Sequence, residues 1–173
     1  MARVSEDRFE QLILPHLDDA YTLARYLLRD AHDAQDAVQD AALRAFRYFD
    51  SYRGGDARAW FLAIVRNCCH TWTRRHGGLS TIPLVDDHVQ VPQESYATDE
   101  AAIGASEREN IERILAELPI EFREVLVLRE LQELSYLQIG EVLGVPIGTV
   151  MSRLSRARKR VAARLGGHAK EAS

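Results

Sequence analysis

The sequence predicts an all-α protein, in which two small helical domains are joined by a flexible linker. Hydrophobic residues make up 46% of the 173 residues, which is enough apolar surface for packed cores. Gly and Pro number only 10 and 5, whereas strong helix formers such as Ala and Leu are plentiful. Apolar residues recur at spacings of three and four in two stretches, and this period is missing between them. We therefore expect helical domains over 1–76 and 99–173, with a linker over 77–98.

The first domain is expected to be a series of helices interrupted by one loop. A helix is predicted from Asp33, which suits the N-cap, to about Tyr48. Residues 51–56 break the helical period with adjacent glycines and form the expected loop, and a further helix follows over 57–75. The inner stripe of the helix that ends near Tyr48 is expected to be Val38, Ala42 and Ala45.

The second domain begins where the helical period returns, at about Asp99. Pro119 marks the start of a new helix, because proline suits the first helical turn, and this helix is expected to reach about Leu131. The apolar residues on either side of the proline keep helical spacing: Ile111, Ile114, Leu115 and Leu118, then Phe122, Val125, Leu126 and Leu128.

The next segment has the spacing of a helix-turn-helix. Ser135 and Gln138 match a capping box, in which each residue bonds to the backbone of the other. Gly144 suits the left-handed turn after a helix, and Pro146 suits the first position of the next helix, which is expected to reach about Leu165. The segment therefore predicts a short helix, a tight turn and a longer second helix that can enter the major groove of DNA.

The second helix of this motif has an apolar edge beside a basic one. Although the net charge of the chain is -4, residues 147–165 carry bases and no acid. A solvated basic helix is one reading, but arginine bonds two guanine acceptors at once and hydroxyls hold phosphates, which favours DNA binding. The apolar edge, which must pack on the domain, is Val150, Leu154, Ala157 and Val161. The basic arc, expected to contact DNA, is Thr149, Ser152, Arg153, Arg156, Lys159 and Arg160.

A resemblance to region 4 of the extracytoplasmic-function sigma factors, the smallest members of the sigma-70 family, covers 134–161, LSYLQIGEVLGVPIGTVMSRLSRARKRV. Their region 2 is resembled by 33–52, DAQDAVQDAALRAFRYFDSY, and by 53–76, RGGDARAWFLAIVRNCCHTWTRRH. The resemblance implies a dissociable subunit that directs the core RNA polymerase of bacteria to particular promoters. The first domain would then bind the polymerase clamp and the promoter -10 element, and the second the polymerase flap and the -35 element.

The resemblance implies that the exposed side of the helix ending near Tyr48 binds the polymerase clamp. The inner stripe of this helix belongs to the core, so the opposite side is left for a partner. A solvated face with charge pairs four residues apart is the alternative reading. The candidates for core polymerase binding are Asp36, Gln39, Asp40, Leu43 and Arg47.

The resemblance places recognition of the -10 element in the 51–56 loop and the helix after it. Opening a promoter requires a base to leave the stack, which costs a few kcal/mol and is offset by stacking and hydrogen bonds in a pocket. Trp60 is expected in the core, whereas Trp72 suits either the core or a base. The candidates are Tyr52, Arg53 and Asp56 in the loop, followed by Arg58, Arg66, Asn67, His70, Thr71, Arg74 and Arg75.

The linker is acidic as well as extended, and no Lys or Arg lies between residues 77 and 106. The resemblance implies that it runs toward the RNA path of the polymerase, where its acids would mimic RNA. An acidic linker that only keeps the chain soluble is equally consistent with this pattern. The resemblance also implies an anti-sigma protein as a regulatory partner. The acids concerned are Asp86, Asp87, Glu94, Asp99 and Glu100.

Other classes of protein are disfavoured by the sequence. No motif of a phosphate-binding loop, a nucleophile elbow or a dinucleotide site is present, so no enzyme activity, cofactor or small-molecule substrate is expected. Cys68 and Cys69 point about 100° apart on a helix, which is a poor arrangement for zinc ligands, so no metal is expected. The sequence has only weak support for oxidation sensing by this pair and leaves that alternative open. The absence of a signal core and of an apolar run of about 20 residues favours a cytoplasmic protein that does not insert into membranes. A decoy that only titrates an anti-sigma factor would not need the basic arc, and a repressor would need a dimerising domain.

Overall fold

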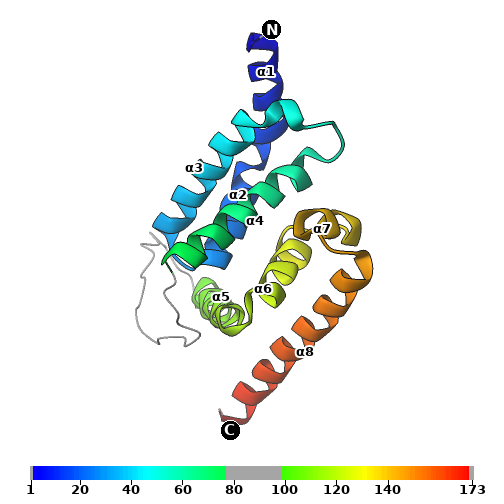
Figure 1. Cartoon of the computed structure of the whole chain (residues 1–173). Coiled ribbons are helices and arrows are strands. Elements are labelled where there is room, and N and C mark those ends of the chain that lie inside the picture. The colour runs from blue at the N-terminus through cyan, green and yellow to red at the C-terminus, as the bar shows by residue number, and fades with distance from the viewer. Residues whose placement is uncertain (1, 77–98, 172–173) are drawn as a thin grey trace.

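The computed structural model describes residues 2–76 and 99–171, which contain helices and no strands, so the all-α prediction is confirmed. The N-terminal helices are α1 (Ala2–Ile13), α2 (Leu17–Leu28), α3 (Ala31–Arg47) and α4 (Ala57–His76). The C-terminal helices are α5 (Asp99–Glu117), α6 (Ile120–Leu126), α7 (Tyr136–Leu143) and α8 (Ile147–Glu171). Short helical turns lie at η1 (Leu14–His16), η2 (Phe49–Ser51) and η3 (Val127–Leu131), of which η3 is a π-turn that continues α6. Figure 1 shows the two groups of helices lying side by side.

The predicted linker over 77–98 lies outside the described residues. Within 2–76 and 99–171, no helix combines the length and the apolar character that crossing a membrane requires.

Helices α2, α3 and α4 pack on one another around a core that includes the fully buried Leu23, Phe61 and Leu62. Of the predicted inner stripe, Ala45 is fully buried, whereas Val38 and Ala42 are half-buried and pack against the edge of the core. A run of alanines gives little contrast between the faces of a helix, so the period of α3 was ambiguous in the sequence. Small side chains line the inner face and let α3 approach its neighbours closely: Ala34, Ala37, Ala41 and Ala45.

Helix α3 also begins earlier than predicted. Asp30, not Asp33, is the N-cap, and its carboxylate accepts a hydrogen bond of 2.9 Å from the backbone nitrogen of Asp33. Asp33 lies instead in the first turn, where the positive end of the helix dipole favours a carboxylate. Either aspartate satisfies the sequence pattern of a cap, and the backbone conformation decides between them.

The helix-turn-helix forms as predicted. Ser135 is the N-cap of α7, its hydroxyl accepts from Gln138 N at 3.2 Å, and the amide oxygen of Gln138 accepts from Ser135 N at 2.8 Å. Gly144 adopts the left-handed conformation, with φ of 66°, and ends α7. Helix α8 then runs beyond the expected end at Leu165, to Glu171.

The N-terminal and C-terminal helices are packed against each other, which the sequence did not predict. Helix α4 contacts α7, and α2 contacts α6 and η3. At this interface Arg58 bonds to the carboxylate of Asp19 at 2.7 Å and to the backbone oxygen of Gln132 at 2.9 Å. The side chain of Gln132 in turn donates to the backbone oxygen of Asp19 at 2.6 Å. Helix α4 is therefore covered from two sides, which explains why buried residues occur around much of it.

Arg123 joins the two halves through backbone carbonyls alone. Its guanidinium is buried and donates to Leu115 O, Ala116 O and Leu118 O at 2.9 Å, around the end of α5. It also reaches Tyr26 O and Leu27 O at 3.3 Å, near the end of α2. Burial lowers the pKa of Arg123 to about 10, so the side chain remains a cation at neutral pH. One cation therefore caps the negative ends of two helices.

Candidate nucleic-acid interface

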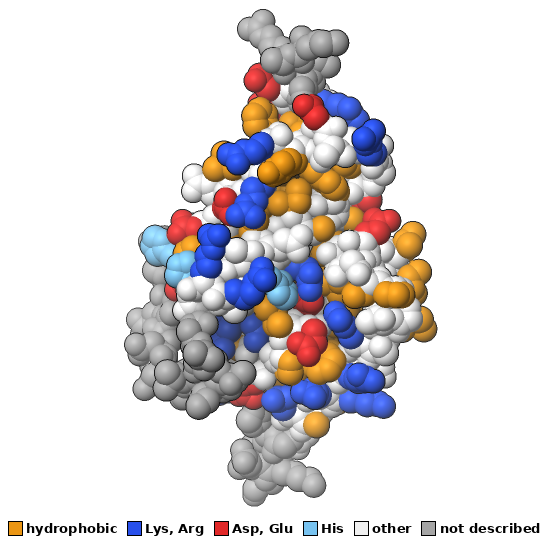
Figure 2. All heavy atoms as spheres, in the orientation of Figure 1, with side chains coloured by type: hydrophobic (Ala, Val, Ile, Leu, Met, Phe, Trp, Pro, Cys, Tyr) orange, Lys and Arg blue, Asp and Glu red, His pale blue; other side chains and the backbone are white. Residues whose placement is uncertain are grey.

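The basic arc of α8 lies at the surface because the opposite edge of the helix is anchored. Val150, Leu154 and Ala157 on the predicted apolar edge are buried, and Val161 is half-buried. Figure 2 shows Lys and Arg side chains along α8, on the outer surface of the molecule. Four members of the arc are exposed, namely Ser152, Arg156, Lys159 and Arg160, whereas Thr149 and Arg153 are half-buried.

Two other arginines of α8 fasten the helix to its own domain. Arg158 bonds to the carboxylate of Glu130 at 2.6 Å, and Arg164 bonds to that of Glu117 at 2.9 Å. The guanidinium of Arg160 lies over the ring of Phe122, with its Cζ 4.7 Å from the ring centroid, in a cation–π contact, and the residue remains exposed. Both ion pairs are partly exposed, so they orient the helix more than they stabilise it.

The loop before α4 is built around Tyr52. Its ring is buried and stacks with Phe49 at 5.8 Å between centroids, and its hydroxyl donates to Gly55 O at 2.6 Å. Gly54 and Gly55 both have φ near +90°, a conformation that favours glycine. The phenol therefore shapes this predicted base-holding loop from inside, while Arg53 is exposed at its rim.

The carboxylate of Asp56, a candidate for -10 recognition in the loop, accepts two hydrogen bonds within the protein. Its Oδ1 accepts from Ala59 N at 2.9 Å at the start of α4, and its Oδ2 accepts from the amide of Gln138 in α7. Partial burial alone would raise the pKa of Asp56, but the bonds from Gln138 and from the backbone of Ala59 and Arg58 hold it below its usual range. Asp56 is thus charged, and its Oδ2 is occupied by Gln138 of the C-terminal domain.

The promoter candidates on α4 divide into two groups. Asn67, Arg74 and Arg75 are exposed, and Thr71 is half-buried with its hydroxyl 3.4 Å from Arg74. Arg58, Arg66 and His70 are half-buried because they are engaged by the opposing domain. Trp60 packs partly buried against the core, as predicted. Trp72 is stacked on His76 at 3.8 Å between ring centroids.

Glu124 of α6 collects three of the predicted DNA-contacting side chains, and we call this group the Glu124 cluster. Arg66 donates to both carboxylate oxygens, at 2.8 and 3.0 Å, and His70 Nε2 lies 2.9 Å from Oε2. Arg153 of the basic arc lies 3.9 Å from Oε1. The Glu124 side chain is only 1% exposed. Burial would raise its pKa, but the bonds and charges of His70 and Arg66 keep that pKa below its ordinary value.

Sequence reasoning missed Glu124. It interrupts an apolar run between Phe122 and Leu128, and a charge at an inward position of that kind requires a partner. The pattern signals a buried ion pair, yet the two hydrogen-bonded partners, Arg66 and His70, are more than 50 residues away in sequence and belong to the other domain.

All five clamp candidates on α3 are exposed. Asp40 pairs with Arg44 at 3.0 Å, as in a solvated helix face. Leu43 is 62% exposed, and the neighbouring Phe46 and Tyr48 are 49% and 57% exposed, so the face is also apolar. Exposed apolar side chains beside charges are typical of a protein-binding surface.

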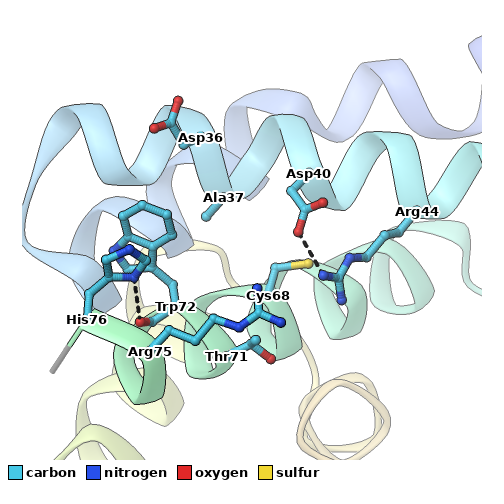
Figure 3. Close-up of a pocket in the computed structure, with 9 residues that line it drawn as sticks. All are labelled: Asp36, Ala37, Asp40, Arg44, Cys68, Thr71, Trp72, Arg75 and His76. Carbon is cyan, nitrogen blue, oxygen red and sulfur yellow. Dashed lines mark hydrogen bonds and ion pairs between the residues drawn. The ribbon is translucent and has the colours of Figure 1, made fainter. Parts of the chain in front are cut away.

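A pocket of about 250 Å³ lies between α3 and α4 and brings the clamp and promoter candidates together (Figure 3). Asp36 and Asp40 line one wall, and Thr71 and Arg75 line the other. Cys68 also lines this pocket but is buried, as is Cys69. Burial raises the pKa of Cys68 to about 11 and that of Cys69 to about 12, so both thiols stay protonated, which disfavours the alternative of oxidation sensing that the sequence left open.

Residues 12–78 match the family model of sigma-70 region 2, and residues 108–161 match that of sigma-70 region 4. The extracytoplasmic-function RNA polymerase sigma factor SigM of Mycobacterium tuberculosis is 39% identical over 168 residues, which cover 95% of this chain and 82% of that protein. The chain belongs to the extracytoplasmic-function sigma factors of the sigma-70 family. The sigma factor SigE of Mycolicibacterium smegmatis is 33% identical over 163 residues. The match covers 94% of the present chain and 63% of the length of SigE.

A solved structure of a sigma factor is similar to this one, and a second solved structure shares its fold. The sigma factor RpoE of Bartonella quintana, in complex with the anti-sigma factor NepR, superposes with a TM-score of 0.72 and 26% identity, covering 92% of this chain and 97% of that one. CnrH in complex with the cytosolic domain of CnrY gives a TM-score of 0.67 at 23% identity, covering 96% and 94% of the two chains, and shows the fold.

Proposed function

We propose that this sigma factor binds core RNA polymerase and directs it to particular promoters, without catalysing a reaction itself. The observation that carries the proposal is the helix-turn-helix, whose capping box and left-handed Gly144 are both formed and whose α8 presents the basic arc outward. The chain works in the cytoplasm, where the polymerase and promoter DNA are its partners. No cofactor, metal or small-molecule substrate enters this function.

The -35 element is the target of the basic arc. Arg156 and Lys159 stand exposed one turn apart, and Ser152 stands toward the N-terminus of the helix, where phosphates are favoured. Because Arg158 and Arg164 are tied to carboxylates outside the arc, the free cations lie on the side that faces away from the domain.

The -10 element is the target of the loop and α4. Arg53 at the loop rim and the exposed Asn67, Arg74 and Arg75 supply donors for bases and phosphates. Tyr52 supports the loop through its hydrogen bond to Gly55, so its contribution is to shape the base pocket.

The clamp of the polymerase is the target of the exposed face of α3. The apolar centre at Leu43 and Phe46, bordered by Asp36, Asp40 and Arg47, has the composition of a protein interface. A structure similar to this one is the sigma factor RpoE bound to the anti-sigma factor NepR. An anti-sigma protein that covers the α3 face would keep this chain from binding the polymerase clamp.

The acidic linker remains a separate part of the proposal. Its acids, outside the described residues except for Asp99 and Glu100 at the start of α5, would lie near the RNA path and mimic RNA charge. Neutralising all five acids should change abortive initiation if the mimicry is correct, and unchanged abortive products would reject it.

Run-off transcription with purified core polymerase tests the function as a whole. The intact chain is added to core enzyme on a library of promoter fragments, and the transcripts are sequenced. Promoter-specific transcripts that require the chain support the proposal. Core enzyme that gives the same products with and without the chain would refute it.

A further inference from the structure

Three predicted DNA-contacting residues are turned toward the protein interior by one carboxylate. Arg66 and His70 come from α4 and Arg153 from α8, and all three meet Glu124, which is 1% exposed. A carboxylate that receives two parallel bonds from a guanidinium offers the same acceptors as a phosphate or a guanine edge. While these bonds persist, the same donors are unavailable to a promoter.

A second tie closes the same interface. The amide of Gln138, in the first turn of α7, donates to Asp56 at the base of the predicted -10 loop. Arg58, another promoter candidate, bonds across the interface to Gln132 O at 2.9 Å. Four candidates for the -10 element are thus held by residues of the other domain.

The packed arrangement is too short to contact both promoter elements. Elements centred about 25 base pairs apart are separated by about 85 Å of duplex, at about 3.4 Å per base pair. A compact chain of 173 residues has a radius of gyration of about 16 Å, and hence a diameter of about 40 Å. The two domains therefore have to separate before the -10 and -35 elements are bound together.

We propose that the free chain is self-inhibited by an interdomain latch, in which Glu124 takes the place of DNA at Arg66 and His70. This inference rests on the proposed function, because it assigns the regulation of the same DNA-contacting residues. The latch opens when core polymerase binds the two domains at separate places. Since the carboxylate belongs to the C-terminal domain and its bonded partners Arg66 and His70 to the N-terminal domain, separation of the domains frees these two donors in one step.

Two substitutions weaken the latch in different ways. Glu124→Gln keeps the shape of the side chain but removes its charge and leaves an amide facing the donors of Arg66 and His70. Gln138→Glu preserves the capping box, which accepts either residue, but places a second carboxylate beside Asp56. The matched control is Glu130→Gln, which removes one carboxylate from a pair with Arg158 inside the C-terminal domain.

The experiment compares the full-length chain and these variants by small-angle X-ray scattering and by binding of a fluorescein-labelled mixed-sequence duplex. We expect both latch variants to increase the radius of gyration and to bind the duplex at least about fivefold more tightly than the wild type. Glu130→Gln should leave the radius of gyration unchanged, which separates opening of the latch from a simple gain of positive charge.

The outcomes distinguish the latch from the proposed function. Gln138→Glu chains that stay folded by circular dichroism, keep the wild-type radius of gyration and bind DNA no more tightly would overturn the latch. Run-off transcription by wild-type chain and core polymerase would still support the proposed function in that case. An opened, DNA-binding variant that never yields transcripts with core polymerase would instead refute the proposed function and leave the latch standing.

Discussion

The side-chain amide of Gln138 makes two hydrogen bonds with different roles. Its oxygen completes the capping box of α7, and its nitrogen donates to the carboxylate of Asp56. Asp56 in turn caps α4 through Ala59 N at 2.9 Å. The starts of the two helices are therefore linked, one in the helix-turn-helix and the other directly after the loop predicted to hold a promoter base.

Replacing Ser135 or Gln138 by alanine should separate the two roles of this amide. Ser135→Ala removes only the cap, and we expect the free energy of unfolding to fall by about 1 kcal/mol. Gln138→Ala removes part of the capping box and also the bond to Asp56, so the pKa of Asp56 should rise toward its ordinary value. Urea unfolding measures the first effect and NMR titration of the Asp56 carboxyl the second. An Asp56 pKa that moves equally in both variants would argue against the shared amide.

Arg123 should be among the residues most sensitive to substitution. Arg123→Met leaves the carbonyls at the ends of α2 and α5 without this donor and removes a charge that stabilises both helix dipoles. We expect a loss of about 3 kcal/mol in the free energy of unfolding. Arg123→Lys keeps the charge but not the planar fork, so its loss should be intermediate. A methionine variant as stable as the wild type would contradict the capping role.

Gly140 has a steric role that helix propensity alone would hide. A Cβ built there lies 2.9 Å from Val145 O, in the turn of the helix-turn-helix, so alanine has to push that turn away. We expect Gly140→Ala to lower the melting temperature, although alanine is favoured in helices by about 1 kcal/mol. Gly148→Ala is the control, because its Cβ meets nothing within 4 Å and the change should stabilise α8. If Gly140→Ala and Gly148→Ala stabilise the protein equally, the turn moves away from the new Cβ at no cost, and the steric role of Gly140 is wrong.

The low pKa of Glu124 predicts a specific pH dependence. Its folded-state pKa lies below the ordinary 4.5, so its contribution to stability is complete above about pH 4.5 and is lost as the pH falls through the folded-state value. At neutral pH we expect Glu124→Gln to be less stable than the wild type by about 1–3 kcal/mol. Denaturant unfolding from about pH 7 down to about pH 3 should bring the two curves together. A stability difference that is independent of pH would mean that charge is not what Glu124 contributes.

Local signals in the sequence were sufficient for the helix-turn-helix. Ser135, Gln138 and Gly144 each act on backbone atoms a few residues away, so their pattern predicted the actual geometry. The apolar edge of α8 was equally clear, because Val150, Leu154 and Ala157 stand out against charged neighbours.

Long-range packing was not predictable in the same way. The alanine-rich α3 offered no contrast between Val38 and Ala37, and the choice of inner face was made by α2 and α4. The interdomain contacts of Glu124 and Arg66 join residues 58 positions apart, which no spacing rule relates. The half-burial of Arg66 and His70 follows from their contacts with Glu124 and was equally unpredictable from the sequence.

The most direct test of DNA reading by α8 compares Arg156→Ala with Arg164→Ala in run-off transcription with core polymerase. Arg156 is exposed in the basic arc, whereas Arg164 is paired with Glu117 outside it. If Arg156 reads a base of the -35 element, Arg156→Ala should weaken promoter binding by about 1–3 kcal/mol, which corresponds to a loss of about 5- to 150-fold in promoter-dependent transcription. Arg164→Ala should stay near the wild type. Equal transcription from both variants and the wild type would contradict promoter recognition by the arc.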